Sequence, residues 1–144
     1  MHSTLADTKS LIRRFENAMN ARQLDLLDEL IAPDFVRHCQ ATPAFDVRSL
    51  DQFKAFLRQD AAMFPDNVQT FTHILVDGDM AAIWATYEGT QMGQMGPFPP
   101  AEKKASFDFS GVLRMENGKI AEWWVTWDNL TILGQLGHLP TPSG

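Results

Sequence analysis

The side chain best placed for acid–base chemistry is the carboxylate of Asp128. It stands where an expected strand, residues 118–127, runs into a short expected helix at the margin of a core. A carboxylate in such a place can act as a general base once burial raises its pKa toward the working pH. The same aspartate is also a favourable helix N-cap, which would accept the backbone N–H of Leu130 or Thr131 and have a lowered pKa. The sequence leaves both interpretations open.

His38 and His73 are the other candidates for proton transfer or hydrogen bonding to a ligand. His38 ends a short expected strand, residues 34–38, where it could relay a proton at the mouth of a pocket or serve as a structural rim histidine. Cys39 follows it directly and points to the opposite face, because strand side chains alternate, so the two cannot form a nucleophilic dyad. His73 has the strand parity of Phe71 and could face the core, although a lone histidine is more often structural.

Length and charge limit the classes of function. The chain has 144 residues, which suits one domain with a core over residues 4–137 and a tail over residues 138–144. It carries 12 Lys and Arg against 18 Asp and Glu, a formal net charge of −6, with no basic stripe. Nucleic acid and anionic membrane surfaces are therefore not expected as partners.

Cysteine and histidine usage gives two further expectations. The single cysteine, Cys39, excludes an internal disulfide, and the N-terminus has no apolar signal segment, so we expect a cytoplasmic protein. The 4 histidines have no metal-ligand spacing and no clustered carboxylates beside them, so no metal site is expected.

The hydrophobic pattern predicts helices first and strands afterwards. Residues 4–20 form an amphipathic helix with a capping box from Thr4 to Asp7, residues 24–31 a short helix ended by Pro33, and residues 49–64 a third helix opened by Ser49. The period then changes to two over residues 68–76, 80–88, 104–115 and 118–127. The sequence thus predicts an α+β fold, a cone-shaped curved antiparallel sheet wrapped around the N-terminal helices, with a cavity inside the cone.

Two segments have a predicted task in this cone. On the last strand Trp124 and Asp128 should face the cavity, while Trp123, Val125 and Trp127 should lie on the convex face. An apolar convex face needs a cover, so we expect a homodimer through it. The connection over residues 91–103 is either a lid over the pocket or an oversized hairpin loop.

Four stretches carry a resemblance to a known family: IRRFENAMNARQLDLLDELIAPDFV, AMFPDNVQTFTHILVDGDMAAIWATYEGT, GTQMGQMGPFPP and NGKIAEWWVTWDNLTILGQLG. They resemble the SnoaL-like polyketide cyclases and ester cyclases, within the superfamily of nuclear transport factor two and ketosteroid isomerase. The resemblance implies the cone fold and an intramolecular aldol-type ring closure on a small, mostly apolar carbonyl compound, with Asp128 as the acid–base residue. It implies neither a metal nor an organic cofactor.

The resemblance also suggests which residues shape the pocket. The family loop usually has a histidine where this chain has Gln91, which can hydrogen-bond a carbonyl but cannot shuttle protons. With His38 as a second catalytic candidate, the expected ligand contacts are Gln91, Trp124, Tyr87, Phe109, His73 and Phe35.

Two alternatives to a cyclase or isomerase stay open on the same fold. One is a module that only binds a small apolar ligand or dimerises. The other is a hydrolase or dehydratase, and the epoxide hydrolases of this fold use an Asp-Arg-Asp arrangement that the sequence alone does not identify here.

Overall fold

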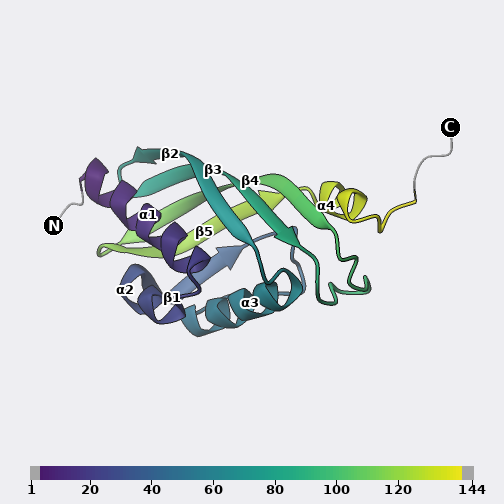
Figure 1. Ribbon diagram of the computed structural model, residues 1–144. Helices are drawn as coiled ribbons and strands as arrows, with labels where there is room; N and C mark the ends of the chain where they lie inside the picture. Colours follow the sequence, from purple (N-terminus) through teal and green to yellow (C-terminus); the bar gives the residue numbers. More distant parts are fainter. Residues whose placement is uncertain (1–3, 141–144) are drawn as a thin grey trace.

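The computed structural model describes residues 4–140, which form one curved sheet with helices on one side (Figure 1). The elements are α1 (Leu5–Asn20), a 3-10 turn η1 (Leu24–Leu26), α2 (Leu27–Leu30), β1 (Ile31–His38), α3 (Leu50–Met63), β2 (Val68–Asp77), β3 (Met80–Thr90), β4 (Lys104–Glu116), β5 (Lys119–Trp127) and α4 (Asn129–Gln135). The predicted α+β architecture, with a curved sheet that does not close on itself, is confirmed.

The sheet has five strands in the order β1-β5-β4-β3-β2. The pairs from β2 to β5 are antiparallel, as expected, but β1 joins the edge of the sheet parallel to β5. The second helix ends at Leu30, not at Ile31, and Pro33 lies inside β1. Proline is tolerated there because β1 is an edge strand whose register is interrupted between Ile31 and Val36.

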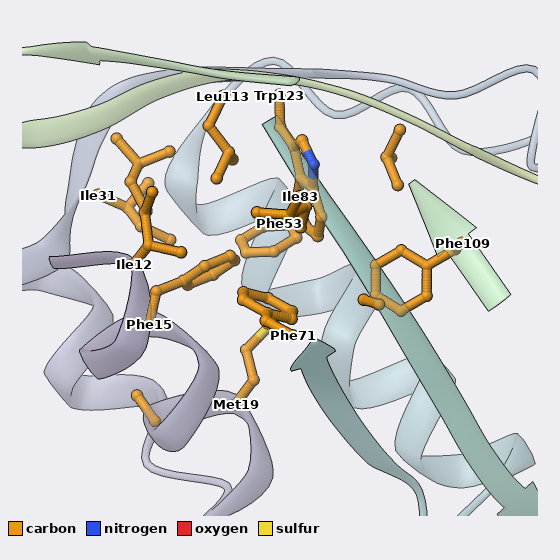
Figure 2. Close-up of a cluster of buried hydrophobic side chains, with 14 of the residues drawn as sticks. Ile12, Phe15, Met19, Ile31, Phe53, Phe71, Ile83, Phe109, Leu113 and Trp123 are labelled. Atoms are coloured by element: carbon orange, nitrogen blue, oxygen red, sulfur yellow. The ribbon is translucent and has the colours of Figure 1, made fainter. Parts of the chain in front are cut away.

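Aromatic side chains fill the space between the helices and the sheet (Figure 2). Phe15 of α1 lies 5.5 Å from the ring of Trp123 and 6.1 Å from that of Phe53. In Figure 2, Leu113 and Trp123 point from the sheet toward α1. Gly111 leaves room for the indole of Trp123, because a Cβ at that position would lie 2.5 Å from the indole nitrogen.

The assignment of faces on β5 was wrong. Trp123 and Val125 are only 4% and 5% exposed and face the core, whereas Trp124 is 38% exposed on the outer face of the sheet. The physical reason is a bulge: Arg114 pairs with Glu122 and Met115 with Ile120, so Ala121 is an extra residue in β5. Buried Ile120 and exposed Trp124 therefore lie on opposite faces in spite of their even spacing.

Side chains of α1 form hydrogen bonds with backbone groups on the free edge of β2. The amide of Asn20 accepts from the backbone N–H of Gln69 at 2.9 Å and donates to the carbonyl of the same residue at 2.7 Å. Glu16 and Arg13 make the corresponding hydrogen bonds with the N–H and carbonyl of Phe71. At these two residues the edge of β2 is therefore not available for pairing with another chain.

Asn20→Ala should lower the free energy of unfolding by about 1–3 kcal/mol, because it leaves two backbone groups of a buried residue without partners. Asn17→Ala, an exposed position on the same helix, is the matched control and should change stability by less than about 0.5 kcal/mol. Urea unfolding of both variants measures the difference. Equal stabilities would show that the edge contacts contribute nothing.

Candidate functional site

A cavity of about 610 Å³ lies between α3 and the inner face of the sheet. Its walls are mostly apolar, and the aromatic residues among them include Phe53, Phe56, Phe107, Phe109, Trp123 and Trp127. The loop that follows β1, the tip of the loop between β3 and β4, and α4 border it at one end. A cavity of this size can hold a drug-sized or polycyclic molecule.

Asp60 places a carboxylate in this apolar cavity. It lies on the face of α3 that also carries Phe53, Phe56 and Phe64, so the fold of the helix turns it inward with the apolar residues. Both carboxylate oxygens accept from the hydroxyl of Tyr87, at 3.1 and 3.0 Å. Burial raises the pKa of Asp60 from 3.8 to about 6, and the Tyr87 hydrogen bond and the charge of Arg37 only partly offset this effect.

Tyr87 holds Asp60 in place. Its ring stacks on Phe107 at 5.0 Å and meets the ring of Phe64 edge-on at 5.8 Å, which fixes the direction of the hydroxyl. Burial and the neighbouring carboxylate raise the pKa of the Tyr87 phenol, so it remains a hydrogen-bond donor. The carboxylate is thus oriented and still has lone pairs free to accept a proton.

Arg37 adds a cation to the same cavity. It is 8% exposed on β1, and its Nη1 donates to Thr42 Oγ1 at 3.0 Å. Its guanidinium carbon lies 4.1 Å from the centre of the Phe56 ring. Burial lowers the pKa of Arg37, but an arginine remains charged in proteins. The cavity therefore contains a carboxylic acid poised near neutrality, a phenol donor and a fixed positive charge.

Asp128 does not face the cavity. It is exposed, and its carboxylate accepts from the backbone N–H of Leu130 at 2.9 Å and from the hydroxyl of Thr131 at 3.0 Å. The N-cap interpretation is confirmed, and the expected orientation into the cone was wrong because the cap turns both oxygens toward the first turn of α4. An acid–base role for Asp128 stays a prediction, which the experiments below include.

His38 and Trp124 lie on the outer face of the sheet, away from the cavity. Their rings stack at 5.2 Å, and His38 Nε2 donates to Glu122 at 2.6 Å. Because β1 alternates, it is Arg37, not His38, that points inward. The predicted position of His38 at the cavity mouth was therefore wrong, as was that of Trp124 inside the cone.

His73 and Phe35 also differ from their expected positions. Phe71 pairs with Ala85 but His73 pairs with Trp84, so Thr72 is an extra residue that turns His73 outward. Phe35 is fully buried beside Phe53, at 4.9 Å, and belongs to the packed core and not to the cavity wall. Of the residues predicted to contact a ligand, Tyr87 and Phe109 do line the cavity.

Gln91 organises the loop after β3 and does not line the cavity. Its side chain is 0% exposed, donates to the carbonyl of Gly93 and accepts from the N–H of Ala101. His138, expected in the tail, donates to the same amide oxygen at 2.7 Å. The loop tip that Gln91 supports, residues 94–98, borders the cavity, which is compatible with the lid interpretation.

Neither Asp60 nor Arg37 was predicted as a site residue, although the sequence pattern marks both. Asp60 interrupts the apolar stripe of the third helix at the same spacing as Phe53, Phe56 and Phe64. Arg37 has the strand parity of Phe35, which was expected inside. A charged residue on an apolar face is the pattern that marks both.

Residues 4–140 give less support to a metal site or to a membrane-spanning helix. No group of three or more His, Cys, Asp or Glu side chains in this range is placed to hold a metal ion. None of the helices that the structure describes is both long and apolar enough to cross a bilayer. The cavity is therefore the strongest candidate site of the described chain.

Comparison with known proteins identifies the family. The model of the SnoaL-like polyketide cyclases matches residues 9–136, whereas no curated protein matches the chain in sequence. TsrD from Streptomyces laurentii is 26% identical, with a TM-score of 0.84 over 95% of this chain and 99% of that one. IdmH from Streptomyces antibioticus, described as a candidate polyketide cyclase, is 31% identical, with a TM-score of 0.80 over 90% and 97%. AclR from Streptomyces galilaeus, described as a candidate hydroxylase, shares the fold at 24% identity, with a TM-score of 0.81 over 95% and 100%. The chain belongs to the SnoaL-like polyketide cyclase family.

Proposed function

We propose that this protein closes a ring in a small, largely apolar compound that carries two carbonyl groups, and that Asp60 is the acid–base residue. The observation that carries the proposal is a carboxyl group with a pKa of about 6 inside an aromatic cavity, oriented by the hydroxyl of Tyr87. A general base works best when its pKa lies near the operating pH.

The reaction is an intramolecular aldol addition. The Asp60 carboxylate takes a proton from the carbon next to one carbonyl, and the C–H electron pair forms an enolate. The enolate carbon forms a bond to the second carbonyl carbon, whose π electrons move to its oxygen. That alkoxide takes the proton back from Asp60, so the product is an isomer of the substrate.

The cavity supports such a reaction by its shape. Phe53, Phe107 and Trp123 belong to different elements and enclose the ligand from several sides. Apolar walls hold a flexible chain folded, which brings its two carbonyl groups together before the reaction. They also keep the local dielectric low, which strengthens the effect of Asp60 and Arg37.

Two alternatives remain distinguishable. An Asp-Arg-Asp hydrolase needs a second carboxylate, and among the described residues that line the cavity Asp60 is the one carboxylate. A module that only binds ligands would hold an apolar ketone without exchanging its protons.

The α-protons of 2-tetralone, a bicyclic ketone that the cavity can hold, test the first half of the reaction. We expect the protein to accelerate their exchange with deuterium in D₂O, followed by NMR, beyond the rate in buffer alone. Thermal shift measures binding in the same samples. Binding without accelerated exchange would support the binding module and contradict the cyclase.

We also propose that the outer face of the sheet joins two copies of the chain. The exposed side chains of Leu75, Trp84, Val112 and Trp124 lie on this face, at 70%, 48%, 38% and 38% exposure. A second copy offers the same apolar surface, so a two-fold axis would cover both.

Val112→Lys should therefore convert a dimer into a monomer in sedimentation equilibrium, because it places a charge in the centre of the contact. Leu130→Lys, at an exposed apolar position on α4, is the control and should leave the dimer intact. A monomeric parent protein would contradict the proposal.

A further inference from the structure

Arg37 is a buried cation whose hydrogen-bonding capacity is only partly used. Nη1 donates to Thr42, and Nη2 donates to none of the described residues; Nε has no partner either, but protein atoms enclose it fully, so a ligand can use only the Nη groups. The nearest carboxyl group in the cavity, that of Asp60, accepts its hydrogen bonds from Tyr87. Burying a cation without full pairing is costly, so the site favours a ligand that supplies an acceptor.

The aromatic residues around Arg37 determine how a ligand can approach it. The guanidinium carbon lies 4.1 Å from the centre of the Phe56 ring and 5.6 Å from that of Trp127. Rings at these distances interact with a guanidinium and restrict the directions from which a ligand can approach it. The terminal edge of the guanidinium, with Nη1 and Nη2, forms a fork that matches the two oxygens of a carboxylate.

A neutral acceptor forms weaker hydrogen bonds with this fork than a carboxylate does. An ester or ketone oxygen accepts hydrogen bonds but carries no charge, and charge-assisted hydrogen bonds are roughly twice as strong as neutral ones. The low dielectric of the cavity increases this difference. Arg37 thus distinguishes between an acid and its ester when the carbon skeleton is the same.

We propose that the ligand of this cavity is an apolar carboxylic acid, whose carboxylate binds the edge of Arg37 while its carbon skeleton lies against the aromatic walls. This rests on the proposed function, because it names the substrate class of the same site: a free acid, not an ester or thioester. The carboxylate end then lies beside Phe56, one helical turn from Asp60, and the skeleton extends toward the acid–base residue.

Calorimetric titration with 2-naphthoate and with methyl 2-naphthoate at pH 7.5 tests this proposal. These probes share one ring system and differ in the charged group. We expect the acid to bind at least 10-fold more tightly than the ester to the unaltered protein. Equal affinities, or tighter binding of the ester, would overturn the proposal without any variant.

Variants then assign the preference to Arg37. Arg37→Met, which keeps length and apolar packing, should reduce the ratio of the two affinities to about one while the affinity for the ester changes less than about 3-fold. Arg58→Met, an exposed position on α3 outside the cavity, should keep the full ratio. If Arg37→Met fails to fold by circular dichroism, Arg37→Lys keeps the charge but lacks the fork, and should reduce the ratio at least 3-fold. An unchanged ratio in a folded Arg37 variant would overturn the assignment.

The two experiments distinguish a failure of this proposal from a failure of the proposed function. Proton exchange of 2-tetralone without a preference for naphthoate would leave the acid–base chemistry standing and remove the acid as ligand class. A preference for naphthoate without proton exchange would identify a site that binds acids and does not catalyse ring closure.

Discussion

Asp60→Asn should reduce proton exchange of 2-tetralone, and any ring closure, by about 10²–10⁴-fold, the usual contribution of a general acid–base residue. Asparagine has nearly the same shape and can still accept a hydrogen bond from Tyr87. Its amide cannot take or return a proton. The cavity therefore keeps its form and loses its base, so binding of the ketone by thermal shift should change little.

Asp128→Asn is the matched control for this experiment. Asparagine caps helices as well as aspartate, so this variant should fold normally and retain exchange within about 3-fold of the parent. The opposite pattern, in which Asp128→Asn loses exchange and Asp60→Asn keeps it, would return the acid–base role to the residue that the family resemblance implied. It would also mean that Asp128 leaves its cap during the reaction.

The same Asp60→Asn change should make the protein more stable at pH 7.5, by up to about 3 kcal/mol. The pKa of Asp60 is about 6 in the folded protein and 3.8 without the fold. Two pKa units correspond to about 3 kcal/mol of preference for the protonated form in the folded state. Asparagine removes the cost of holding a charge in the cavity, so the residue that is needed for activity lowers stability.

The sign of the pH dependence follows from the direction of the pKa shift. Between pH 3.8 and about 6 the folded state binds more protons at Asp60 than the unfolded state does. The contribution of Asp60 to the free energy of unfolding is therefore greatest below its pKa in the unfolded state. It is lost as the pH rises through its pKa in the folded state. Urea unfolding of both proteins at pH 4.0 and 7.5 measures this loss as a difference, in which the other titrating groups cancel. A stability difference that is the same at both pH values would contradict the raised pKa.

Local patterns in the sequence were sufficient for the architecture. The capping box of Thr4 and Asp7 and the N-cap at Ser49 are present as predicted. Both rest on hydrogen bonds between residues three apart, which local sequence determines. The change from helical to strand period likewise identified the four antiparallel strands, because burial of one face imposes it.

The candidate site was less predictable, because single extra residues reverse which face a side chain occupies. Thr72 and Ala121 are such residues, and beyond each of them the side chains of the strand occupy the face opposite to the one that simple alternation predicts. Nothing local distinguishes a bulged strand from a regular one at these positions. The role of Gln91 was equally hidden, since its contacts run to His138 and across its own loop.

Asp60 was predictable in position but not in chemistry. The stripe of Phe53, Phe56 and Phe64 implies that residue 60 faces inward. Its pKa is raised by burial among residues of several elements, an effect that the Tyr87 hydrogen bond and the charge of Arg37 only partly offset. Only the folded chain brings these groups together.

The most direct test of the account is the titration of the Asp60 carboxyl itself, by NMR of protein labelled with ¹³C at aspartate carboxyl carbons. Asp60→Asn identifies the signal by its loss. We expect a midpoint of about 6 for this carboxyl. A midpoint at or below its ordinary value of 3.8 would contradict it, because Asp60 would then be a permanently ionised group with no proton to return to a substrate.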